Sequence, residues 1–275
     1  MGSTKPALTA KEKFARIKIK FERAKKHSVD LGKAYKAYLH SEPNEVGVKR
    51  DPQTRKPIYY VVRVTPIPDE LAVIAADVIH NLRVTLDHMA WQLFLMGPDA
   101  RPNRDFKFPI KNDAPSFAAY LKSATETLRK DAIEALRSVE PYKGGQGHGL
   151  WELNRLNNID KHRLLVTVGG AFAGVSVGPI AARFMELLTE KVWPVPTVPQ
   201  FGFFLKPADR HCPLKAGDEL FVDSPDAEFN QNMKFLFGVA FNEPGVIDAK
   251  AILEAIDDFG KSVSRACTLL KPCLA

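Results

Sequence analysis

The stretch 69–96, DELAVIAADVIHNLRVTLDHMAWQLFLM, constrains the fold more than any other part of this 275-residue chain. Its apolar residues recur at three- and four-residue spacing, which predicts one long helix with a stripe facing a core. Pro68 and Asp69 suit the start of a helix, and Gly97-Pro98 suits its end. The stripe consists of Leu71, Ile74, Val78, Leu82, Leu86, Met89 and Leu93. Further elements must cover this stripe, so the chain is expected to build a bundle around it.

The same stretch carries a dense set of polar residues, gathered into about three turns of the predicted helix. These residues are Asp77, His80, Asn81, Arg83, Asp87 and His88. At about 100° per residue, Asp77, Asn81 and His88 follow one edge of the apolar stripe. His80, Arg83 and Asp87 lie along the other side. No other stretch gathers as many groups that are able to do acid–base or phosphate chemistry.

A second polar helix is predicted at 150–163, LWELNRLNNIDKHR. Leucines mark its inner side, but several polar residues fall on nearly the same side or next to it. These polar residues are Asn154, Asn157, Asn158, Asp160, Lys161 and His162. Polar groups on an inner face need partners. The polar residues of 69–96 are the partners that we expect.

The other segments complete an α+β pattern. Apolar spacing predicts helices at 10–39, at 115–136 with a break near Ala124, at 180–192 and at 247–270. A hairpin is predicted from strands at 45–50 and 58–65, and antiparallel strands are predicted at 164–168, 173–177, 201–205, 219–223 and 233–241. The expected fold is mainly a helical bundle, with an N-terminal hairpin and a C-terminal antiparallel β layer that a helix closes.

The expected division of the chain falls near residue 163. Residues 1–163 would form the helical bundle, with the hairpin at 45–65 as an insertion. Residues 164–275 would supply the antiparallel strands and the last helix. We expect the two parts to pack as one unit.

Positive charge is concentrated at the N-terminus. Residues 1–40 hold eleven Lys and Arg and three acids, a net charge of +8, so a total of +7 leaves −1 for the other 235 residues. Lysines and arginines line the outer face of the helix predicted at 10–39. Such a face is either the solvated side of a bundle helix or a surface that binds the phosphates of RNA.

Cysteine usage and hydropathy indicate the expected compartment. The three cysteines, Cys212, Cys267 and Cys273, do not have the spacing of a zinc site, and an odd number is a poor disulfide framework. The N-terminus has no apolar signal core. The uncharged run 164–182 is only weakly apolar and suits buried strands better than a membrane span. A cytoplasmic protein without membrane contact is therefore expected.

The Arg83-Val84-Thr85-Leu86-Asp87-His88 segment on the central helix resembles the motif of HEPN-type ribonucleases. The wider pattern of HNLRVTLDH followed by LNNIDKHR is similar to a group of bacterial proteins without an established activity. In the HEPN family a helical bundle often dimerises, and the Arg and His of two protomers line one cleft that cleaves RNA without metal. Val84 stands where that family often carries a polar residue.

The resemblance implies a role for each residue. Arg83 would stabilise charge on the phosphate, and His88 would act as general acid or base. Asp87 would orient one of them. The residues expected to bind the substrate or to support these side chains are His80, Asn81, Asn158, Asp160, Lys161 and His162. Neither cofactor nor metal is expected, and a homodimer would complete the site.

The same residues also allow a structural interpretation. Arg83 and Asp87 are four residues apart and suit an ion pair on the helix surface. In a wider network, Arg83 or His88 would pair with Asp160, and Asn81 would pair with Asn157, which would fix the register of the two helices. The chain would then be a binding or scaffold protein without catalytic activity.

A third interpretation is a metal site built from histidines and carboxylates on facing helices. His80 and His88 are eight residues apart, which is too far to hold one ion from a single helix. Such a site would need a histidine from each helix.

Overall fold

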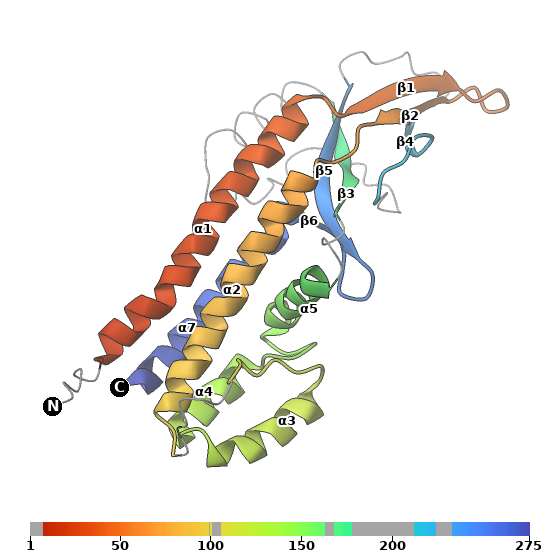
Figure 1. Ribbon diagram of the computed structural model, residues 1–275. Helices are drawn as coiled ribbons and strands as arrows, with labels where there is room; N and C mark the ends of the chain where they lie inside the picture. Colours follow the sequence, from red (N-terminus) through yellow and green to blue (C-terminus); the bar gives the residue numbers. More distant parts are fainter. Residues whose placement is uncertain (1–7, 99, 101–105, 163–167, 178–211, 224–232) are drawn as a thin grey trace. The chain divides into compact units, whose positions relative to one another are not determined.

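The expected α+β class is confirmed in the computed structural model, which describes residues 8–98, 100, 106–162, 168–177, 212–223 and 233–275 (Figure 1). Helices dominate these residues, and two three-stranded antiparallel sheets accompany them. The helix predicted at 180–192 and the strand predicted at 201–205 fall outside the described residues, as do the first four residues of the strand predicted at 164–168. None of the described helices is long and apolar enough to cross a membrane.

The long predicted helices are confirmed with small differences at their ends. They are α1 (Ala10–His40), α2 (Asp69–Leu95), α3 (Ala114–Ser123), α4 (Lys130–Val139), α5 (His148–His162) and α7 (Ile252–Leu270). The expected break near Ala124 is also present, as a 3-10 turn at Ala124–Glu126 that separates α3 from α4. Asp113 begins α3 because its carboxylate accepts a hydrogen bond from Ser116 N at 2.7 Å.

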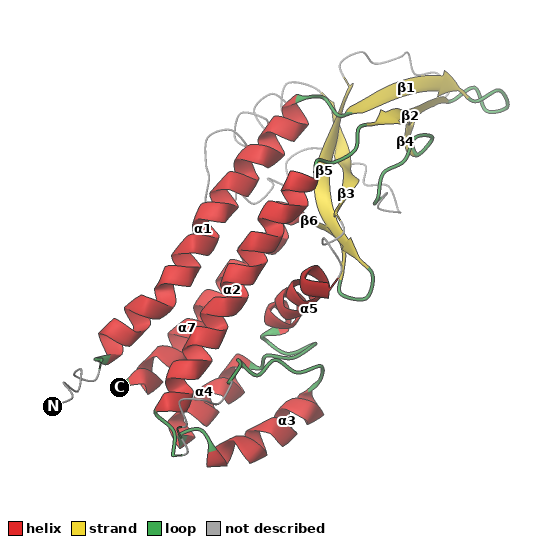
Figure 2. Ribbon diagram, viewed as in Figure 1, coloured by secondary structure: helices red, strands yellow, loops and turns green. Residues whose placement is uncertain are grey.

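The strands form two separate sheets, drawn in yellow in Figure 2. One sheet has the order β1-β2-β4, from β1 (Asn44–Arg50), β2 (Pro57–Val64) and β4 (Glu219–Val222). The other has the order β3-β5-β6, from β3 (Val168–Val177), β5 (Met233–Glu243) and β6 (Ile247–Ala251). The predicted hairpin is confirmed, since Val48 faces Tyr59 and Arg50 faces Pro57 in the β1–β2 register.

The predicted helix 247–270 is wrong in its first five residues. Ile247–Ala251 forms strand β6, and α7 begins at Ile252. A turn brings the segment back beside β5, where Glu243 faces Ile247 and Phe241 faces Lys250. Pairing with β5 satisfies the backbone of these residues, and this tertiary contact overrides a helical pattern of apolar residues.

The chain divides into two compact units. Unit 1 contains Met1–Ser28, Ala76–Leu165 and Ile256–Ala275, and unit 2 contains Val29–Ala75 and Val166–Ala255. In unit 1 the core is made of helix residues such as Leu86, Leu136 and Phe259, all 1% exposed or less. In unit 2 both sheets contribute to the core, where the Tyr59 and Phe235 rings lie 5.4 Å apart.

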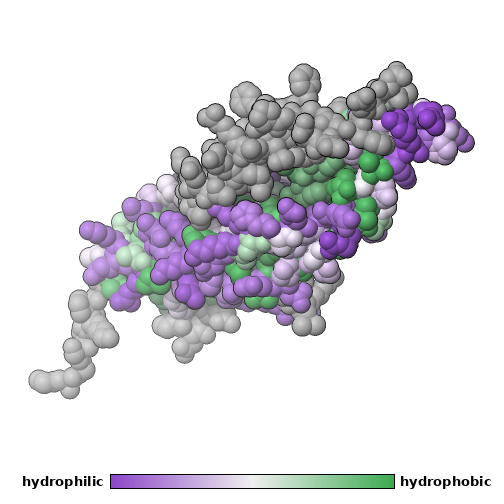
Figure 3. All heavy atoms as spheres, turned by 90° about the horizontal axis from the view of Figure 1, so that it is seen from above, coloured by the Kyte–Doolittle hydropathy of each residue, from purple (hydrophilic) through white to green (hydrophobic). Residues whose placement is uncertain are grey.

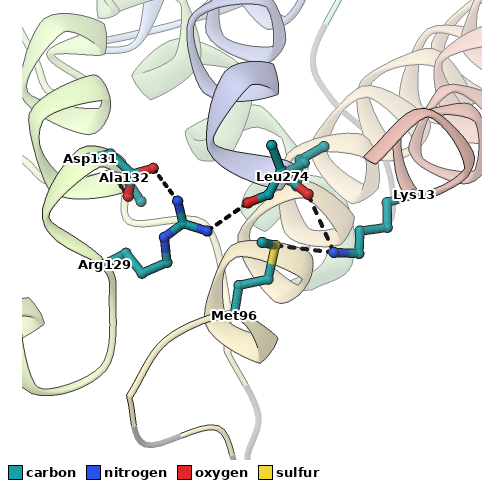
Figure 4. Close-up of polar contacts among 7 residues, drawn as sticks. Lys13, Met96, Arg129, Asp131, Ala132 and Leu274 are labelled. Atoms are coloured by element: carbon teal, nitrogen blue, oxygen red, sulfur yellow. Dashed lines mark hydrogen bonds and ion pairs between the residues drawn. The ribbon is translucent and has the colours of Figure 1, made fainter. Parts of the chain in front are cut away.

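Two cationic side chains hold the last residues of the chain in place within unit 1 (Figure 4). Lys13 Nζ donates hydrogen bonds to Leu274 O at 3.3 Å and to Met96 Sδ at 3.2 Å. Arg129 donates to Ala275 O at 2.7 Å and contacts Asp131 at 2.7 Å. Lys13 therefore lies on the inner side of α1 and does not belong to its exposed basic face.

Candidate functional site

The Arg83 side chain points inward from α2 and is buried at 7% exposure. Its Nε donates to Asn154 Oδ1 at 2.9 Å, which joins α2 to α5. Its Nη2 donates to the carbonyl of Phe108 at 3.2 Å. Its Nη1 forms an ion pair with Asp87 Oδ1 at 2.8 Å. Each guanidinium nitrogen thus has a polar neighbour within the protein.

Asp87 completes the same arrangement from one turn further along α2. Its Oδ1 accepts a hydrogen bond from Phe108 N at 2.9 Å, so the ion pair holds both backbone groups of one residue. The Phe108 side chain is only 2% exposed, and the neighbouring Phe106 ring stacks on Phe94 at 4.7 Å. We call Arg83, Asp87, Asn154 and the Phe108 backbone the Arg83 network. It fastens the segment before α3 to the central helix.

The electrostatics of the Arg83 network follow from this burial. Burial lowers the pKa of Arg83, and the charge of Asp87 acts in the opposite direction. Arginine keeps its proton in proteins, so the guanidinium stays charged. A buried charge is costly without partners, and the network provides them from three separate segments.

His88 lies in different surroundings from Arg83. Its side chain is exposed, whereas that of Arg83 is buried. Five residues on a helix correspond to a rotation of about 140°. Within one chain, the two groups that the ribonuclease motif requires therefore face different sides of α2.

The predicted partners within the network differ from those observed. Arg83 pairs with Asp87 and Asn154, whereas the expected network paired Asp160 with Arg83 or with His88. The buried amide of Asn81 donates to the carbonyl of Asp77, one turn earlier, at 2.8 Å. The predicted ion pair of Arg83 and Asp87 is present, but it is mostly buried.

A second cluster of polar residues, Asp160 of α5 with His80 and Asp77 of α2, lies where the two helices are close. Burial raises the pKa of Asp160, the charge of His80 lowers it, and the charge of Asp77 raises it. Asn158, Lys161 and His162 from the same helix are exposed. Within the described residues, no three His, Cys, Asp or Glu side chains are arranged to hold a metal ion.

Sequence reasoning missed two members of the Arg83 network as site residues. Asn154 stood in the predicted polar row of its helix, so a signal for it existed. Phe108 belongs to the short apolar segment FKFPI, and its contribution to the network comes from its backbone. Side-chain patterns hold no signal for a backbone contact across 25 residues.

Comparisons with protein-family models, curated proteins and solved structures found no match for this chain.

Proposed function

We propose that this protein is a non-catalytic RNA-binding protein in which the Arg83 network has a structural role. The observation that carries the proposal is the burial of Arg83, whose guanidinium is already engaged by Asn154, Phe108 and Asp87. A phosphate could approach this guanidinium only if the network opened. The residue that would stabilise a reacting phosphate is thus used to hold the helices together.

The RNA contact in this proposal is the exposed side of α1. We define the α1 basic face as its exposed cations within unit 1: Lys11, Arg16, Lys18, Arg23 and Lys26. Two pairs of these cations, Lys11 with Lys18 and Arg16 with Arg23, are seven residues apart, which places the members of each pair about 10.5 Å apart along the helix. Such a row of positive charge is complementary to a phosphate backbone.

The acids of α1 leave this face largely uncompensated. Glu22 pairs with Lys25 at 3.3 Å, and Asp30 pairs with Lys33 at 3.5 Å, so two acids are used by lysines outside the defined face. The hydrogen bonds that Glu12 accepts from Thr9 lower its pKa, and the charge of Arg16 lowers it further without an ion pair. In the described part of the chain, none of the five cations of the α1 basic face forms an ion pair. They remain available to an anionic partner.

The test is the affinity for a fluorescein-labelled single-stranded RNA, measured by anisotropy at several salt concentrations. Lys26→Gln should lower the magnitude of the slope of log K against log salt by about 0.7, the value for one lost phosphate contact. Lys33→Gln is the matched control, because it removes the same charge from the same helix where Asp30 already compensates it. The RNA should stay intact in excess EDTA. Equal effects of both variants, or no binding by the wild type, would contradict the proposal.

A metal-independent ribonuclease is the second candidate, and the exposure of His88 is the observation that favours it. An exposed imidazole is accessible to RNA as a general acid or base. In that case the wild type would cleave RNA in EDTA, and His88→Ala would abolish cleavage without changing stability. Cleavage of this kind would replace the non-catalytic proposal.

A further inference from the structure

The turn between β1 and β2 forms a second basic surface, which belongs to unit 2. We call residues 49–56, KRDPQTRK, the hairpin tip; it contains four cations and one acid, a net charge of +3. Arg50 and Arg55 are exposed, and Lys56 is half-buried. Figure 3 shows hydrophilic residues at this end of the hairpin, at the right-hand edge of the view.

Hydrogen bonds hold the hairpin tip in one conformation. The Asp51 carboxylate accepts from Gln53 N at 2.9 Å and from Thr54 N at 2.6 Å. Asp51 N donates to Lys56 O, and Arg55 N donates to Asp51 O, both at 2.9 Å. The Arg50 guanidinium donates to Arg55 O at 3.0 Å. The tip is therefore ordered before any partner arrives, which lowers the entropic cost of binding.

Arg55 occupies a backbone position that ordinarily selects glycine. Its φ is +62°, in the left-handed region. Left-handed residues are common in hairpin turns, and glycine is the usual residue at such positions. A side chain at such a position costs conformational free energy. A residue kept at such a cost indicates a role for the guanidinium itself.

The cations of the hairpin tip differ in their local partners. The Lys49 ammonium lies 3.4 Å from Glu219 and above the Tyr60 ring, so it is compensated within the sheet. Among the residues that the structure describes, no acid pairs with Arg55 or Lys56. These two side chains are the part of the tip that an anionic ligand meets.

We propose that the hairpin tip is a second RNA contact, in which Arg55 and Lys56 bind backbone phosphates. This inference rests on the proposed RNA-binding function. The guanidinium of Arg55 presents two parallel N–H groups that match two phosphate oxygens. The Asp51 hydrogen bonds fix the loop, and the Arg50 contact with Arg55 O holds the residue that bears the guanidinium.

The decisive variant is Arg55→Gly in the full chain. Glycine adopts the left-handed backbone at no steric cost, so the turn and its thermal stability should be kept or improved. The dissociation constant for the labelled RNA should rise roughly two- to five-fold, the range expected for an exposed ion pair. The magnitude of the salt slope should fall by about 0.7. Gln53→Ala, in the same turn and without charge, is the matched control and should bind like the wild type.

The outcomes separate this inference from the function on which it rests. Weaker RNA binding by Arg55→Gly with unchanged thermal stability supports the hairpin contact. If Arg55→Gly melts at a lower temperature, weaker RNA binding by Lys56→Gln serves as the supporting result. Wild-type affinity in Arg55→Gly, together with weaker binding by Lys26→Gln, overturns the hairpin contact and leaves the proposed function. A wild-type protein that does not bind RNA overturns both. Heparin bound as tightly as RNA overturns the assignment of RNA as the partner.

Discussion

At the scale of single residues, surroundings decide what a side chain does. Arg83 and His88 form a motif in the sequence, yet one is buried among polar partners and the other is exposed. Helical periodicity placed Arg83 beside the apolar stripe, but whether that side faced a cleft or the protein interior depended on other segments. The partner from α5 and the backbone of Phe108 settle that question.

The first prediction concerns the stability of Arg83→Ala and His88→Ala. Loss of the guanidinium leaves Asp87 and Asn154 without their partner, so Arg83→Ala should lower the free energy of unfolding by about 2–4 kcal/mol. His88→Ala removes an exposed side chain and should change it by no more than about 0.5 kcal/mol. Urea denaturation followed by circular dichroism measures both. Similar small losses in the two variants would be incompatible with the Arg83 network.

The second prediction concerns Asp160 and pH. Burial raises the pKa of this carboxyl group above its ordinary value of 3.8. The folded state therefore holds the proton more tightly than the unfolded state, and the free energy of unfolding falls as the pH rises from about 3.8 through the folded pKa. Asp160→Asn has no ionisable group at this position, so its free energy of unfolding does not fall for this reason. Its stability relative to the wild type should increase over that pH range and then stay constant, as thermal melts at several pH values would show. A difference that does not vary with pH would count against the effect.

At the scale of elements, regular segments could be predicted and contacts between distant segments could not. The apolar repeats located α1, α2 and α5, and the break near Ala124 separates α3 from α4 as expected. The strand β6 was missed because its pairing with β5 is a tertiary contact. The segment FKFPI is apolar, but its docking on Arg83 and Asp87 depends on the backbone groups of Phe108.

The third prediction compares two helical glycines. Among the described residues, a Cβ at Gly32 of α1 meets nothing within 4 Å, whereas one at Gly149 of α5 would lie 2.7 Å from Ser262 Oγ of α7. Gly32→Ala should therefore stabilise the protein by about 0.5–1 kcal/mol, since alanine is the better helix former. Gly149→Ala should be destabilising because α5 and α7 approach closely there.

The cause of the Gly149 effect is tested in a double variant. Ser262→Ala removes the hydroxyl and leaves its Cβ at 3.6 Å, an ordinary contact. Gly149→Ala should then be tolerated, with a coupling free energy of about 1 kcal/mol in a double-mutant cycle monitored by urea denaturation. Additive effects of the two substitutions would rule out a steric cause.

At the scale of the whole molecule, composition alone hides where positive charge is available. The first 40 residues carry a net charge of +8, and the remaining 235 residues carry a net charge of −1. Those 235 residues nevertheless contain the hairpin tip, whose local charge of +3 is offset by acids elsewhere. A net charge cannot separate cations that are paired, such as Lys49, from cations such as Arg55, whose side chain forms no ion pair among the described residues.

The Arg83 network also limits how this sequence can change over evolutionary time. Arg83 and Asp87 recognise the N–H and C=O of position 108, which every residue except proline presents. Position 108 is therefore open to other apolar residues that fill the same space, whereas proline is excluded. Replacing Arg83 or Asp87 alone leaves the charge of the other residue buried or half-buried without its partner. Homologous proteins should therefore keep both residues or replace both together. Homologous sequences should show correlated substitution at 83 and 87 and independent drift among apolar residues at 108.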